Sequence, residues 1–153
     1  AYEHLAALAA KGYLESSRRG FRLPGAPAVM VPVLGRVPAG SPREPLPAPE
    51  GYVPWPASFG RKARDLFALR VRGDSMTGAG VEEDDLIVCA RDLAAREGDV
   101  VVALAEGGAT VKRLGRADGR LALLPANPRY KPLPVGEDTR VIGRVIGVLR
   151  SFL

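Results

Sequence analysis

The amino-acid sequence predicts a mainly β protein. Its 14 prolines and 18 glycines fall between short apolar runs, which indicates brief strands joined by turns rather than a bundle of helices. Three dipeptides, Gly98-Asp99, Gly107-Gly108 and Asp118-Gly119, are typical of hairpin turns. A chain of 153 residues, 46% of them hydrophobic, is long enough for one main domain with a small appendage.

Short apolar runs predict where the strands lie. In the first run after Asp65, Phe67, Leu69 and Val71 alternate with Ala68, Arg70 and Arg72, a period that predicts a half-buried strand. An earlier apolar run predicts a strand at 30–37. The strands expected after it are 66–72, 85–91, 99–105, 109–114, 120–124 and 141–152.

The N-terminal part of the chain has a different pattern. An alanine-rich run at 2–12 predicts the later part of a helix, and the runs 13–15 and 21–23 around a basic turn predict a small hairpin. This combination fits a winged helix, but it fits equally an amphipathic helix packed on the main body beside a solvated loop. The stiff stretch Pro24-Gly25-Ala26-Pro27 then predicts a domain boundary.

A proline-rich segment follows the strand predicted at 30–37. Proline has no N–H to donate to a sheet, so we expect this segment not to pair regularly. Loops longer than about 12 to 15 residues in compact domains are usually functional or disordered, so the segment is a candidate for a moving element. Its prolines are Pro38, Pro42, Pro45, Pro47, Pro49, Pro54 and Pro56.

Composition argues against several classes of protein. No apolar run approaches the roughly 18 to 20 residues needed to span a bilayer, and we identify no signal peptide, so we expect a soluble protein with no membrane partner. Cys89, the only cysteine, lies in an apolar run and is expected to be a buried, inert thiol. With one histidine and no clustered carboxylates, we expect no metal and no cofactor. The net charge of +5 fits contact with nucleic acid but also fits an ordinary arginine-rich protein.

Ser75 is the first candidate for chemistry. It lies in Gly73-Asp74-Ser75-Met76, directly after the alternating strand, where glycine allows a sharp turn. If a helical turn begins after Ser75, free N–H groups beside its hydroxyl would stabilise an oxyanion. Glycine-flanked serines are also common in ordinary turns, so a nucleophile needs a base nearby.

Lys112 is the candidate base. The only histidine, His4, lies in the N-terminal helix, so no Ser-His-Asp triad can form within the β region. Of the four lysines, Lys112 is the one inside a predicted strand, where it shares a face with Thr110 and Leu114. A lysine acts as a base only when burial favours its neutral amine, and the alternative is a solvated strand lysine.

Two of these segments together resemble a known family. Gly73-Asp74-Ser75-Met76 and Val111-Lys112-Arg113 are similar to the serine-lysine dyad of LexA-type self-cleaving repressors, which include phage repressors and UmuD-type proteins. The segment 33–40 resembles the one that carries the family's scissile bond, here Ala39-Gly40. Segments 124–132 and 143–148 also resemble the family, so the similarity covers essentially the whole chain. Pro38, just before Ala39, departs from the small non-proline residue also common there.

The N-terminal segment resembles the end of a LexA recognition helix and its wing. The first two helices of that winged helix-turn-helix are absent from this sequence, so we expect this chain not to read an operator alone. The resemblance implies that Glu3, Arg18 and Arg19 contact DNA. It divides the chain into a partial winged helix-turn-helix at 1–24, a linker at 25–29, and a peptidase and dimerisation domain at 30–153.

The resemblance also implies a fold and a function. The fold would be a LexA/signal-peptidase-like β domain of short, highly twisted strands. Ser75 would be the nucleophile and Lys112 the general base in cleavage of the Ala39-Gly40 bond, without a cofactor. The implied partners are operator DNA, the RecA filament on single-stranded DNA and a second copy in a homodimer, in the bacterial cytoplasm at the nucleoid. The alternatives are a phage-type repressor and a β interaction domain that does not cleave itself.

Overall fold

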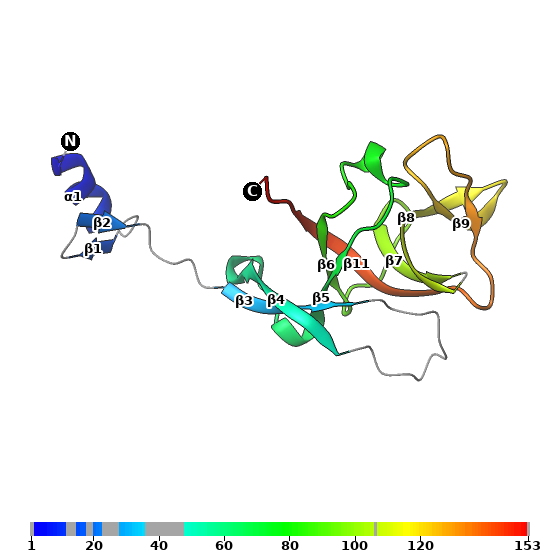
Figure 1. The fold of residues 1–153 in the computed structure, drawn as a ribbon, viewed down its shortest axis with the longest axis horizontal. Coiled ribbons are helices and arrows are strands. Elements are labelled where there is room, and N and C mark those ends of the chain that lie inside the picture. Colours follow the sequence, from blue (N-terminus) through cyan, green and yellow to red (C-terminus); the bar gives the residue numbers. More distant parts are fainter. Residues whose placement is uncertain are drawn as a thin grey trace.

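The computed structural model describes residues 2–11, 15–17, 20–22, 28–35, 48–105 and 107–152. Within these ranges the chain is mainly β, which confirms the predicted fold class. Figure 1 shows the strands in sequence colours.

The N-terminal elements are a helix and a hairpin, as predicted. Helix α1 spans Tyr2–Ala10, and strands β1 (Glu15–Ser17) and β2 (Gly20–Arg22) pair antiparallel with Ser17 opposite Gly20. The paired residues reach closer to the turn than expected, because Ser16 and Ser17 belong to the first strand. The winged-helix interpretation of these elements stays a prediction.

The other described strands form one nine-stranded sheet. Its order is β10-β9-β8-β7-β11-β6-β5-β3-β4, so the last strand in sequence lies in the middle (Figure 1). Three short 3-10 turns, η1 (Ala57–Phe59), η2 (Ala63–Asp65) and η3 (Thr77–Ala79), connect strands. The strands are β3 (Ala28–Leu34), β4 (Pro49–Pro56), β5 (Leu66–Arg70), β6 (Leu86–Ala90), β7 (Val100–Ala105), β8 (Gly108–Ala117), β9 (Arg120–Leu124), β10 (Leu133–Pro134) and β11 (Arg140–Leu149).

The expectation that the proline-rich segment does not pair was wrong for its last part. Strand β4 contains Pro49, Pro54 and Pro56 and pairs antiparallel with β3 along its whole length. The physical reason is its position at the edge of the sheet, where a residue without an N–H can face away from the neighbouring strand. Strand β3 also begins two residues earlier than predicted, at Ala28.

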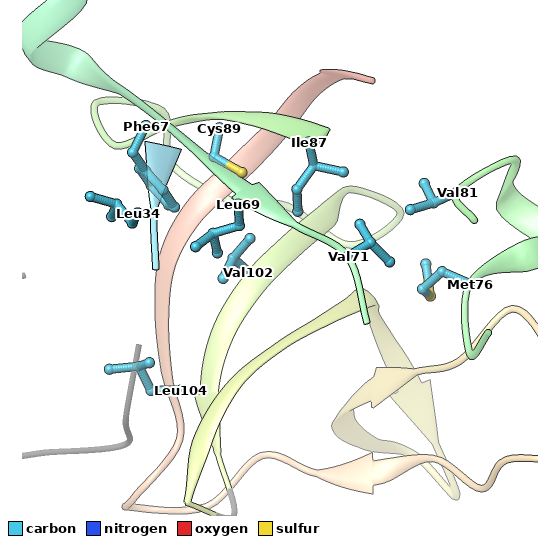
Figure 2. Close-up of a cluster of buried hydrophobic side chains, with 10 residues drawn as sticks. All are labelled: Leu34, Phe67, Leu69, Val71, Met76, Val81, Ile87, Cys89, Val102 and Leu104. Atoms are coloured by element: carbon cyan, nitrogen blue, oxygen red, sulfur yellow. The ribbon is translucent and has the colours of Figure 1, made fainter. Parts of the chain in front are cut away.

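The expectation that strand 66–72 is half-buried was also wrong. Leu66, Phe67 and Ala68 are all at most 1% exposed, because β5 has an apolar cluster on each face. Phe67 belongs to the cluster drawn in Figure 2, whereas Leu66 and Ala68 pack with Val31 and Trp55. The cluster in Figure 2 consists of Leu34, Phe67, Leu69, Val71, Met76, Val81, Ile87, Cys89, Val102 and Leu104.

Strand β11 joins the two halves of the sheet. It pairs antiparallel with β7 through 140–144 and with β6 through 144–149, with a register shift in each pairing. At Gly147 it passes directly over the Trp55 ring, and a Cβ there would lie 2.2 Å from Trp55 Cη2. Glycine is therefore required at this close approach.

Candidate active site

Ser75 lies in the turn between β5 and β6. Gly73 has a φ of +77°, a conformation that glycine adopts without strain, and it turns the chain sharply before Ser75. The next residue, Met76, is 2% exposed and reaches the apolar cluster of Figure 2 together with Val81. Burial of Met76 anchors the turn, while the half-buried Ser75 lines a cleft.

Lys112 reaches Ser75 from strand β8. Its side-chain amine Nζ lies 2.8 Å from Ser75 Oγ, 2.9 Å from Thr110 Oγ1 and 2.9 Å from the carbonyl oxygen of Val111. The Thr110 contact agrees with the expected strand face, on which residues two apart lie side by side. The structure thus brings together two residues that are 37 positions apart in the sequence.

Burial changes the acidity of Lys112. The residue is only 7% exposed, and desolvation lowers the pKa of its amine below the ordinary value, because the ammonium form loses hydration. Its three oxygen partners are two hydroxyls and a carbonyl, none of which carries a negative charge to restore the ammonium form. A neutral Lys112 has a lone pair that can accept the Ser75 hydroxyl proton.

The loop after β9 holds the Ser75 turn by main-chain hydrogen bonds. The Ala126 N–H donates to the Ser75 carbonyl at 2.8 Å, and the Gly78 N–H donates to the Ala126 carbonyl at 2.7 Å. A Cβ at Gly78 would lie 2.5 Å from that carbonyl oxygen, so this contact requires glycine. Asn127 adds a side-chain hydrogen bond, from Nδ2 to the Asp74 carbonyl, at 2.9 Å.

Asp74 carries an anchor of its own beside Ser75. Its carboxylate accepts hydrogen bonds from the Tyr130 hydroxyl and the Arg129 guanidinium. The Tyr130 hydrogen bond, aided by the positive charge of Arg129, lowers the pKa of Asp74 below its ordinary value. These contacts join the Ser75 turn to the loop after β9 a second time.

A buried ion pair holds the other end of the turn. The Asp85 carboxylate, 1% exposed, accepts hydrogen bonds from Arg150 Nε at 2.6 Å and Arg150 Nη2 at 2.7 Å. Arg150 Nη2 also donates to the Gly80 carbonyl at 3.0 Å. The Arg150 hydrogen bonds lower the pKa of Asp85, and the contacts with Asp85 and Gly80 tie the segment after Ser75 to the residue that follows β11.

The cleft beside Ser75 has a volume of about 780 Å³. Ser75 and Lys112 line it, and so do Gly35 and Glu50, which lie at the end of β3 and the start of β4. The segment 36–47 joins those two strands, so both of its flanks reach the same cleft. Apolar lining comes from Leu34, Leu69, Val71, Met76, Val111 and Leu133.

Five other residues were predicted to belong to a site. Ala39, Gly40, Arg18 and Arg19 lie outside the described residues, and Glu3 is exposed on α1. Cys89 is fully buried, as predicted, and burial raises the pKa of its thiol. Among the residues with described positions, no three His, Cys, Asp or Glu side chains are grouped to hold a metal ion, and no helix has the length and hydrophobicity to cross a membrane.

Several residues of the site were not identified from the sequence. Asp85 and Arg150 are 65 positions apart, and no local pattern relates them. Asn127, Arg129 and Tyr130 lie in the segment 124–132, which stood out in the sequence only for its resemblance to the family. The sequence did offer one chemical signal for the ion pair. Asp85 comes directly before an apolar strand, and an aspartate that is buried needs a positively charged partner.

Comparisons with known proteins agree with this arrangement. Residues 32–146 match the Peptidase S24-like family. The LexA repressor of Carboxydothermus hydrogenoformans is 36% identical over 99% of this chain and 78% of its own length, and that of Syntrophobacter fumaroxidans is 39% identical over 99% and 76%. The LexA repressor of Halorhodospira halophila is 40% identical over the whole chain and 76% of its own length. The chain therefore belongs to the LexA repressor family, and its residues 32–146 form a Peptidase S24-like domain.

Proposed function

We propose that this protein is a repressor that inactivates itself by cutting its own Ala39-Gly40 bond. The observation that carries the proposal is the 2.8 Å contact between Ser75 Oγ and the amine of a desolvated lysine. The names of the relatives and the Peptidase S24-like match support the same function.

The proposed chemistry is acyl transfer through a serine ester. Ser75 Oγ attacks the Ala39 carbonyl carbon while Lys112 Nζ takes the hydroxyl proton. The amide N–H groups of Ser75 and Met76 have no acceptor among the described residues, so they are available to the oxyanion. Lys112 then gives its proton to the Gly40 amine as the C–N bond breaks, and water hydrolyses the ester to leave Ala39 as a carboxylate.

The substrate is the chain's own 36–47 segment. Ala39 follows Gly35, which lines the same cleft as Ser75, by four residues, and an extended chain spans at most about 3.5 Å per residue, so at most about 14 Å of chain separates the bond from the cleft lining. Tethering makes the reaction intramolecular, which favours the rate. It also permits regulation, since a segment held away from Ser75 is not cut.

Cleavage would end repression once the two products separate. In this proposal residues 1–24 belong to the DNA-binding part, 25–29 form the linker, and 30–153 form the peptidase and dimerisation domain. A homodimer binds operator DNA through two such parts, so separating them from the dimer removes the bivalent contribution to affinity. The RecA filament on single-stranded DNA would trigger the cut during the SOS response, in the cytoplasm at the nucleoid.

Intact mass of the purified chain over time tests the proposal. At pH 10 the parent chain should give fragments that end at Ala39 and begin at Gly40, faster than at pH 7, because more Lys112 is neutral. Ser75→Ala should stay whole because it lacks the nucleophile. Lys112→Ala should also stay whole, because loss of a general base lowers a rate by about 10² to 10⁴. A folded parent chain that remains whole at pH 10 would support a β interaction domain that does not cleave.

A further inference from the structure

Strand β3 precedes the proposed cut, but both of its neighbours in the sheet follow it. We propose that after cleavage β3 stays between β4 and β5 as a non-covalently bound strand, so that the N-terminal product is retained until β3 dissociates. The inference rests on the proposed function, because it takes the cut at Ala39-Gly40 as given. The binding site is the slot between β4 and β5, and its ligand is an extended, apolar strand.

Main-chain pairing holds β3 on both sides. It makes seven antiparallel residue pairs with β4, from Ala28 opposite Pro56 to Leu34 opposite Pro49. It also makes two parallel pairs with β5, through Val33 and Leu34. Such pairing is the mode by which proteins bind extended peptides as added strands.

Loss of β3 would leave β4 without a strand partner and β5 with a partner on one side only. Among the described strands, β4 pairs with β3 alone, so dissociation would detach β4 from the sheet. Strand β5 would lose one neighbour and present an open edge. The cut breaks one peptide bond, and none of these contacts involves that bond.

Burial adds to the pairing. Val31 is fully buried and Leu34 is 4% exposed, and they belong to the two different apolar clusters that flank β5. Val31 packs in the cluster that contains Trp55 and Leu66, while Leu34 packs in the cluster of Figure 2. Dissociation of β3 would therefore expose both clusters to water, which opposes it.

Two analyses of one sample test the proposal. The chain is allowed to cleave at pH 10 and returned to pH 7, and it is then measured by mass under denaturing conditions and by size-exclusion chromatography under native conditions. We expect two fragment masses under denaturing conditions and one native species that elutes where the intact chain does.

Substitutions on the two faces of β3 provide a matched pair. Val31→Asp places a charge in a fully buried position and should make the fragments elute separately after cleavage. Met30→Asp makes the same change at the next residue, which is 51% exposed, and should leave co-elution unchanged. If the uncut Val31→Asp chain does not fold, Val31→Ala takes its place and should shorten the lifetime of the nicked complex about tenfold.

Three outcomes would overturn the inference. Fragments of the parent chain that separate at once under native conditions overturn it and leave the proposed function intact. Equal lifetimes for the Val31 and Met30 variants also overturn it, because retention would then not depend on β3 burial. A single intact mass after incubation at pH 10 overturns the proposed function, and this inference with it.

Discussion

Replacing Thr110 with valine should change the protonation of Lys112 with little change in shape. An ammonium has three N–H donors, and Lys112 Nζ has three oxygen partners, one of which is Thr110 Oγ1 at 2.9 Å. The neutral amine has two N–H donors and a lone pair, which faces Ser75 in the proposed mechanism. Thr110→Val therefore removes a charge-assisted hydrogen bond from the ammonium but an ordinary one from the neutral amine.

The change in the neutral fraction of Lys112 depends on how much more hydrogen-bond free energy the ammonium form loses than the neutral amine. Hydrogen bonds to charged groups contribute about 1.5 to 3 kcal/mol and neutral ones about 1, so the ammonium form is disfavoured by about 1 kcal/mol more. At a pH well below the pKa of Lys112, that difference raises the neutral fraction about fivefold. Thr110 is half-buried, so water replaces part of the lost hydrogen bond and fivefold is the upper limit.

Self-cleavage rate constants measured by intact mass from pH 6 to pH 11 provide the assay. The informative quantity is the rate at pH 7 divided by the plateau rate at high pH, since changes in orientation alter both rates and cancel in the ratio. This ratio should rise up to about fivefold in Thr110→Val and stay unchanged in Thr110→Ser, which keeps the hydroxyl. An unchanged ratio in the valine variant, or an equal rise in the serine variant, would refute the reasoning.

Four further predictions concern stability and positioning. The folded pKa of Lys112 lies below its unfolded value of 10.5, so the free energy of unfolding should rise with pH between these two pKa values. Urea unfolding of the Ser75→Ala variant, which does not cleave itself in the proposed mechanism, should show this rise. Adding Lys112→Met to that variant should abolish the rise. Gly147→Ala should destabilise the protein by about 1 to 3 kcal/mol because its Cβ would clash with Trp55, whereas Gly136→Ala, which has open space, should leave the melting temperature unchanged. The folded pKa of Asp74 lies below 3.8, so the stabilisation from its carboxylate is complete above pH 3.8 and is lost as the pH falls through the folded pKa. The unfolding free energies of the parent chain and Asp74→Asn, measured in an acid titration, should therefore converge as the pH falls through that pKa. A constant gap between the two free energies would contradict this. Arg150→Gln should lower the plateau cleavage rate about ten- to a hundredfold, because it loosens the Ser75 turn. Arg144→Gln should leave that rate unchanged, although it removes an equally exposed guanidinium, which pairs with Asp99. Equal rates in the two variants would rule out a positioning role for Arg150.

The parts of the site that follow local rules could be predicted from the sequence. Glycine at position 73 indicates a sharp turn, and strand periodicity places Thr110 and Lys112 on one face. The contact between Lys112 and Ser75 depends on how β5 and β8 are arranged, which local pattern does not specify. The family resemblance supplied the pairing of these residues, and the structure places their atoms 2.8 Å apart.

The parts that depend on position within the sheet could not be predicted. A proline-rich strand such as β4 is allowed only at an edge, and edge positions are decided by the order of all strands. Burial on both faces of β5 likewise depends on β11 and β4, which place Gly143 against Phe67 and Trp55 beside Leu66. The Asp85–Arg150 pair needs the path of β11 before it can be inferred.

The central position of β11 also has a consequence for synthesis. During translation, the strands β3 to β6 and β7 to β10 are complete before β11 leaves the ribosome, yet β6 and β7 are joined in the sheet only through it. Ser75 lies in a turn within the first group, between β5 and β6, and Lys112 lies in β8 of the second group. A nascent chain without β11 therefore holds Ser75 and Lys112 on parts of the sheet that no strand pairing joins, so under the proposed function self-cleavage is expected only once β11 is in place.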